Sequence, residues 1–131
     1  MANKKVLEPT ESELEILQVL WSKGSATVRE VNEELNKKRE VGYTTTLKIM
    51  QIMTEKNLVN RDTQSRTHIY HPSVKENTTQ KNLLQKFIDR TYRGSAMQMV
   101  MQALGHQNAS EEELEELKKL IENIEKNKSE Q

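Results

Sequence analysis

Hydrophobic residues recur at helical spacing over residues 10–56, and capping motifs divide this stretch into three predicted helices. Thr10-Glu11-Ser12-Glu13 and Thr27-Val28-Arg29-Glu30 are capping boxes, in which the threonine hydroxyl accepts a hydrogen bond from a free amide and the glutamate reaches back. The pattern predicts helices over residues 10–23, 27–37 and 43–56.

Beyond the third helix the spacing changes to the alternation that is typical of strands. Residues 58–62 and 67–70 flank Thr63-Gln64-Ser65, and this arrangement predicts a hairpin of two short strands. Asn57, just before the hairpin, is expected to end the third helix in the left-handed conformation.

A polar segment, Asn77-Thr78-Thr79, marks the predicted boundary between a domain of residues 1–76 and a helical domain of residues 77–131. The second domain carries apolar helical stripes, with predicted interruptions at residues 93–95 and 105–109 and a third capping box at residues 110–113. About 50 residues of amphipathic helix with few aromatic side chains make a poor independent core, so we expect two copies to pair through these stripes. The alternative is that the stripes pack back on the first domain in a monomer. The expected dimer contacts are Leu83, Leu84, Phe87, Met97, Val100, Met101, Leu104, Leu114, Leu117 and Ile121.

Composition excludes several classes of function. There is no cysteine, so disulfides, thiolate metal sites and cysteine nucleophiles are all excluded. No glycine-rich phosphate loop or hydrolase motif occurs, and His68 and His71 would point to opposite faces of a strand. We therefore expect no enzyme activity, cofactor or metal site. No signal peptide is evident, and no apolar run reaches the roughly 18 residues of a membrane span, so a cytoplasmic location without membrane insertion is expected.

The formal net charge is zero, but the charge is unevenly distributed. Residues 37–71 contain seven Lys and Arg against three Asp and Glu, a net charge of +4. Residues 111–131 contain eight acidic residues against four basic ones, a net charge of −4. A basic middle segment is typical of a nucleic-acid interface, although two ordinary solvated faces would give the same count.

The order helix, helix, turn, helix, hairpin is that of a winged helix-turn-helix, so the predicted fold class is mainly α, with such a DNA-binding domain followed by a helical dimerisation arm. The third helix can enter a major groove about 12 Å wide, and the hairpin can follow the phosphate backbone. The candidate DNA contacts are Thr27, Thr44, Thr45, Lys48, Gln51, Arg61, Arg66 and His68. The alternatives are helix capping for Thr44, an idle surface position for Lys48 and edge-strand protection for the hairpin arginines.

Several motifs resemble those of the penicillinase-repressor family, which comprises BlaI- and MecI-type proteins and a copper-responsive CopY branch. The resemblance covers about residues 7–127. The residues that carry it are Glu13-Leu14-Glu15-Ile16-Leu17-Gln18-Val19-Leu20-Trp21, Ala26-Thr27-Val28-Arg29-Glu30-Val31, Tyr43-Thr44-Thr45-Thr46-Leu47, Glu55-Lys56-Asn57-Leu58-Val59, Arg66, Tyr70, Pro72 and Ser110-Glu111-Glu112-Glu113-Leu114-Glu115-Glu116-Leu117.

The resemblance implies a dimeric repressor with a winged-helix head and an interlocked three-helix arm, which binds a palindromic operator. It also implies a membrane sensor protease system as a partner, since sensor signalling leads to cleavage of an Asn-Phe bond in the penicillinase branch. Gln102-Ala103 stands near that position here, and the cysteine cluster of the copper branch is absent. The hypothesis is therefore a homodimeric repressor that binds an inverted repeat. Its rivals are a protein-interaction adaptor and a ligand-sensing regulator.

Overall fold

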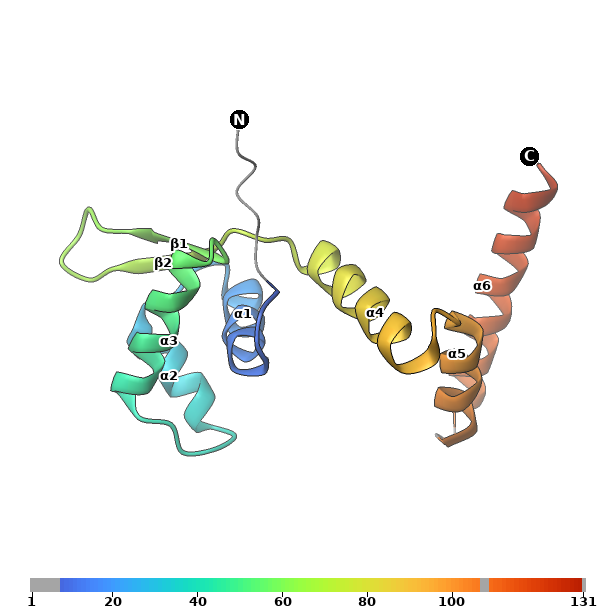
Figure 1. Cartoon of the computed structure of the whole chain (residues 1–131), viewed down its shortest axis with the longest axis horizontal. Helices are drawn as coiled ribbons and strands as arrows, with labels where there is room; N and C mark the ends of the chain where they lie inside the picture. Colours follow the sequence, from blue (N-terminus) through green and yellow to red (C-terminus); the bar gives the residue numbers. More distant parts are fainter. Residues whose placement is uncertain (1–7, 107–108, 131) are drawn as a thin grey trace. The chain divides into compact units, whose positions relative to one another are not determined.

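The computed structural model describes residues 8–106 and 109–130. Along the chain the elements are α1 (Glu11–Lys23), α2 (Val28–Asn36), α3 (Tyr43–Glu55), β1 (Val59–Asp62), β2 (Ile69–Pro72), α4 (Glu76–Tyr92), α5 (Ala96–His106) and α6 (Glu111–Ser129) (Figure 1). The chain divides into two compact units, of which the first ends at Leu84 and the second begins at Gln85, inside α4. The domain boundary expected after residue 76 coincides with the start of α4 and stays a prediction.

The helix ends follow the local signals of the sequence, with one exception. Thr10 and Thr27 form the predicted capping boxes, each accepting a hydrogen bond from the backbone three residues on at 3.2 Å. Asn57 has the predicted left-handed conformation, with φ 64°. α3 is the exception, because its N-cap is Gly42 and no side chain caps it. Thr44 lies inside the first turn, so the helix-capping role considered for it is wrong.

The hairpin is antiparallel, and Arg61 pairs with Tyr70 in its register. Its second strand begins at Ile69 and ends at Pro72, two residues later at each end than predicted. Ala26, between α1 and α2, adds a bridge that the sequence did not predict. The Ala26 amide donates to the Tyr70 carbonyl at 3.0 Å, and the Tyr70 amide donates to the Ala26 carbonyl at 2.8 Å. The hairpin is thereby fixed to the α1–α2 connection.

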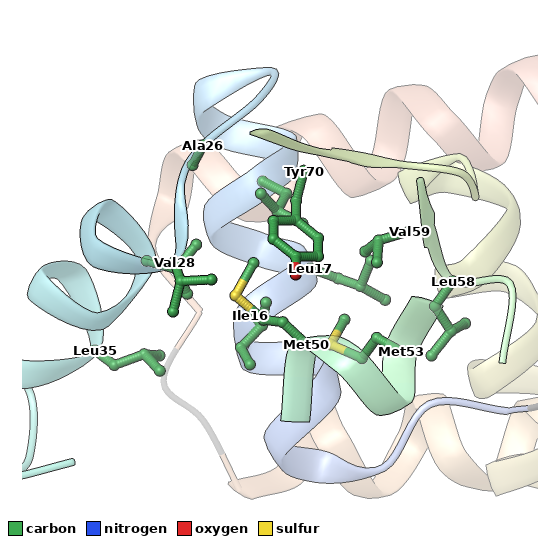
Figure 2. Packing of buried hydrophobic residues seen from close by; sticks show 12 residues of the cluster. Ile16, Leu17, Ala26, Val28, Leu35, Met50, Met53, Leu58, Val59 and Tyr70 are labelled. Carbon is green, nitrogen blue, oxygen red and sulfur yellow. The ribbon is translucent and has the colours of Figure 1, made fainter. Parts of the chain in front are cut away.

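One hydrophobic core joins α1, α2, α3 and the hairpin (Figure 2). Figure 2 shows the Tyr70 side chain reaching from β2 into this cluster. The Trp21 indole lies at the edge of the core and donates to the Val74 carbonyl at 2.9 Å, which secures the chain as it leaves β2. The buried hydrophobic members are Ile16, Leu17, Leu20, Ala26, Val28, Val31, Leu35, Met50, Met53, Leu58, Val59 and Tyr70.

The second unit consists of helices. Arg93 and Gly94, with φ of 53° and 85°, separate α4 from α5 at the predicted break. α5 continues to His106, so the loop predicted from residue 105 starts later than expected. The rest of that predicted loop includes residues 107–108, which lie outside the described residues. Ser110 caps α6 in the predicted capping box. No helix in the described part of the chain has the length and apolar character needed to cross a membrane.

Candidate nucleic-acid interface

A network of amide side chains fixes α3 against α2. Asn32 Nδ2 donates to the Val41 carbonyl at 3.0 Å and to Thr46 Oγ1 at 2.9 Å. Asn36 also binds Val41, which lies in the turn between α2 and α3. Its Nδ2 donates to the Val41 carbonyl at 2.9 Å, and its Oδ1 accepts from the Val41 amide at 3.1 Å. Thr46 is completely buried, and its hydroxyl also donates to the Gly42 carbonyl. Side-chain hydrogen bonds therefore set the orientation of α3 in the helix-turn-helix.

The fixed orientation leaves one polar face of α3 exposed. Thr46, Met50 and Met53 face the core, and the predicted groove-facing residues all lie on the solvent side. Within the described residues none of these side chains makes a hydrogen bond or ion pair, so their polar groups are free to meet a ligand. The set consists of Thr44, Thr45, Lys48 and Gln51.

The hairpin residues predicted to contact DNA are also exposed. Arg61 lies on β1, Arg66 lies in the turn and His68 directly precedes β2. The turn has internal support, because the Gln64 amide donates to Asp62 Oδ1 at 3.0 Å. The arginines are thus presented from a structured hairpin.

Ion pairing separates the cations of the basic segment into two groups. Lys37 pairs with Glu34 at 2.8 Å, and Arg39 pairs with Glu15. The hydrogen bond from Lys37 holds the pKa of Glu34 below its ordinary value, and the same contact raises the pKa of Lys37. Lys56 is likewise paired, with a buried acid of α1. Among the described residues no ion pair is formed by Lys38, Lys48, Arg61 or Arg66.

A cleft with a volume of about 530 Å³ opens between the start of α2, the start of α3 and the hairpin. Its polar lining consists of Thr27, Arg29, Tyr43, Arg66, Thr67 and His68. Three predicted site residues, Thr27, Arg66 and His68, therefore meet in one place, whereas the α3 set and Arg61 do not line this cleft.

The capping box engages the hydroxyl oxygen and the backbone amide of Thr27. Its hydroxyl accepts from the Glu30 amide at 3.2 Å, and its amide donates to the Glu30 carboxylate at 3.0 Å. These hydrogen bonds lower the pKa of Glu30. Thr27 thus has no free backbone amide with which to bind a ligand.

Arg29 and Tyr43 also line this cleft and were not among the predicted site residues. A cation in the first turn of a helix opposes the helix dipole, and Arg29 occupies that position in α2. Tyr43 is an aromatic residue at the first position of α3 and is 50% exposed. The placement of Arg29 is unfavourable for its own helix, which suggests a role beyond folding.

Apolar side chains remain exposed on α4, α5 and α6. Of the predicted dimer contacts, Leu83 and Leu117 are partly buried within the chain. The others are exposed, and Met97 and Met101 are exposed to the extent of 67%. The predicted contacts exposed on these helices are Leu84, Phe87, Met97, Val100, Met101, Leu104, Leu114 and Ile121, and Leu120 and Ile124 extend the exposed face of α6.

Known proteins resemble the chain along most of its length. The family model described as penicillinase repressor matches residues 9–123. The penicillinase repressor of Bacillus licheniformis is 28% identical over 127 residues, which cover 97% of this chain and 99% of that protein. The penicillinase repressor of Staphylococcus aureus is 25% identical over 126 residues, which cover 96% and 99%.

A solved structure resembles the first unit. The solution structure of the DNA-binding domain of the repressor BlaI matches with a TM-score of 0.51 and 27% identity, over 56% of this chain and 90% of that one. This likeness confirms the predicted winged helix-turn-helix. The full-length matches confirm the resemblance predicted from the motifs, and the chain belongs to the penicillinase-repressor family.

Proposed function

We propose that this protein is a homodimeric transcriptional repressor that binds an inverted-repeat DNA operator. The observation that carries the proposal is the exposed polar face of α3, whose side chains have no partner within the described residues and whose helix is held by the Asn32 network. The first unit of the chain, here called the head, is similar to the DNA-binding domain of BlaI, and this similarity also supports DNA binding.

In this proposal α3 reads the sequence and the hairpin supplies general affinity. Thr45 and Gln51 can hydrogen-bond base edges in the major groove, and Lys48 can reach a base or a phosphate. Arg61 and Arg66 have no carboxylate partner among the described residues, so their charge is available for phosphates.

The proposed dimer forms through the exposed apolar faces of α4, α5 and α6. Burying these faces is favourable by roughly 25 cal/mol per Å² of apolar surface. Two-fold symmetry then predicts two half-sites in inverted orientation, spaced by about 10 base pairs or a multiple of it.

A membrane sensor protease is the further partner that we propose on the basis of the family. The residues nearest to the expected cleavage position, Gln102 and Ala103, are exposed but lie inside α5. A protease acts on extended backbone, so cleavage there would require α5 to unwind locally.

The experiment is a binding measurement on duplexes selected from a random pool by the full-length protein. Fluorescence anisotropy on the selected duplex and on a scrambled one, at several salt concentrations, measures specificity and phosphate contacts together. Gln51→Ala and Thr45→Ala should each cost roughly 1–3 kcal/mol on the selected duplex and little on the scrambled one. Arg66→Ala should weaken both to a similar extent.

Two results would contradict the proposal. One is a wild-type affinity that does not change with salt, since phosphate contacts always release counterions. The other is the absence of binding to any duplex at low salt, which would favour a protein-interaction adaptor instead.

A further inference from the structure

The cleft between α2, α3 and the hairpin differs from two other clefts in the charge of its lining. Its lining contains the cations Arg29 and Arg66 together with His68, and no Asp or Glu is among the described residues that line it. The charged residues that line the cleft between α1 and α2 are Glu15, Glu34, Lys23 and Lys38, so its acids and bases balance. The cleft between α5 and α6 is lined by Glu113 and Glu116. The hairpin cleft therefore differs from these two in its charge, and it favours an anionic occupant.

The two arginines of this cleft differ from other cations of the same unit in their ion pairing. Lys37, Arg39 and Lys56 each have an acidic partner in the head, whereas Arg29 and Arg66 form no ion pair within the described residues. Both arginines are exposed and keep their full set of donors. Unpaired arginines that line one concave surface are suited to a phosphate group, which their guanidinium groups can bind with two donors each.

Tyr43 adds a neutral donor to the same cleft. It lies at the first position of α3, its side chain is half exposed, and its hydroxyl has no hydrogen-bond partner among the described residues. The Asn32 network fixes the start of α3, so the position of Tyr43 relative to α2 is also fixed. A phenol at this place can donate to a phosphate oxygen without reading a base.

We propose that this cleft is a binding site for a backbone phosphate of DNA, in which Arg29 and Tyr43 are ligands in addition to Arg66. The inference rests on the proposed function, and it assigns DNA contacts to two residues outside the exposed face of α3. The α2 side of the cleft then holds the sugar-phosphate backbone beside the groove that α3 enters. Arg29 and Tyr43 contribute affinity but no sequence preference.

The test compares Arg29→Gln with Lys38→Gln in the full-length protein. Each variant removes one exposed cation of the head, and neither cation forms an ion pair in the described part of the chain. The two differ in position, because Arg29 lines the hairpin cleft and Lys38 lines the α1–α2 cleft. Arg29→Gln should weaken binding to the selected and the scrambled duplex by the same factor, roughly five- to tenfold. It should also reduce the slope of log affinity against log salt by about one for each bound protomer. Lys38→Gln should stay within about twofold of the wild type.

Two further variants separate charge from hydrogen bonding. Arg29→Lys keeps the charge, so it should restore the salt slope while recovering only part of the affinity, because an ammonium lacks the planar fork of donors. Tyr43→Phe should weaken both duplexes by roughly two- to fivefold without changing the salt slope, because it removes a neutral donor and leaves the ring in place. Circular dichroism of each variant verifies that the helices are retained.

Each opposing result has a distinct meaning. If the wild type binds DNA and Arg29→Gln behaves like Lys38→Gln, the phosphate site is refuted while the proposed function stands. A loss confined to the selected duplex would also refute it, because Arg29 would then contact a base. Inorganic phosphate at constant ionic strength should weaken DNA binding of the wild type more than that of Arg29→Gln, because free phosphate and the DNA backbone would compete for the same cleft. If the wild type binds no DNA, the proposed function itself fails.

Discussion

The substitution Glu13→Gln tests the ion pair that joins α1 to the end of α3. The Glu13 carboxylate accepts from Lys56 Nζ at 2.5 Å and from the Thr10 amide at 2.8 Å. The side chains of Glu13 and Lys56 are only 5% and 16% exposed. The substituted amide keeps the shape of the side chain and one acceptor oxygen, but it leaves the Lys56 ammonium without a counter-charge.

The expected loss of stability follows from the burial of the pair. Removing one partner of a fully buried ion pair costs about 3–5 kcal/mol. Two contacts lower this value, since the amide oxygen still accepts from Lys56 and Lys56 Nζ also donates to the Glu8 carbonyl at 3.3 Å. We expect the free energy of unfolding to fall by about 2 kcal/mol. With a urea m-value of about 1.5 kcal/mol/M, the midpoint should fall by about 1.3 M.

The assay is urea unfolding followed by far-ultraviolet circular dichroism at a fixed protomer concentration. The matched control is Glu15→Gln, which breaks the ion pair with Arg39 by the same chemical change at side chains that are 33% and 51% exposed. Because water screens that pair, its loss should move the midpoint far less. Equal midpoints for Glu13→Gln and Glu15→Gln would refute the reasoning from burial.

Three further predictions concern pH, backbone conformation and assembly. Hydrogen bonds from the capping residues hold the pKa values of Glu30 and Glu113 below the ordinary value of 4.5. The stability that these carboxylates contribute is therefore complete above that pH and is lost as the pH falls through the lowered pKa values. The urea midpoint should decline below about pH 4.5, and it should decline less in Glu30→Gln than in the wild type. Gly24→Ala should lower the free energy of unfolding by about 1 kcal/mol and with it the melting temperature, because φ is 85° at this position. Nothing lies within 4 Å of an added Cβ, so the loss comes from the backbone conformation alone, and an unchanged melting temperature would exclude strain here. Ile121→Asp places a charge on an exposed apolar face of α6, so light scattering should give the mass of a single chain for this variant and of a dimer for the wild type. A single-chain mass for the wild type at micromolar concentration would contradict the proposed dimer.

Local chemistry made much of the fold predictable. The capping boxes at Thr10, Thr27 and Ser110 were found because each is a hydrogen-bonding pattern contained within four residues. The left-handed Asn57 was found for a similar reason, since few residue types tolerate that conformation. The start of α3 at Tyr43 was also predicted, but its cap was not, because Gly42 caps the helix without a side-chain bond.

Contacts between distant residues could not be predicted from the sequence. The bridge between Ala26 and Tyr70 and the ion pair between Glu13 and Lys56 depend on how the elements pack. The same limit applies to the candidate interface. The exposed face of α3 follows from helical periodicity, but the meeting of Arg29 with Arg66 in one cleft requires the hairpin to fold back over the start of α2.

The hydrogen bond between Trp21 and Val74 gives the molecule a built-in optical reporter. The chain has a single tryptophan, and it packs against the core of the head. Its emission therefore reports the state of the head alone, whereas helical ellipticity also includes α5 and α6. Unfolding curves recorded by the two signals would coincide if head and arm melt as one cooperative unit and separate if they do not. The indole thus makes the thermodynamic coupling of the two units measurable without any label.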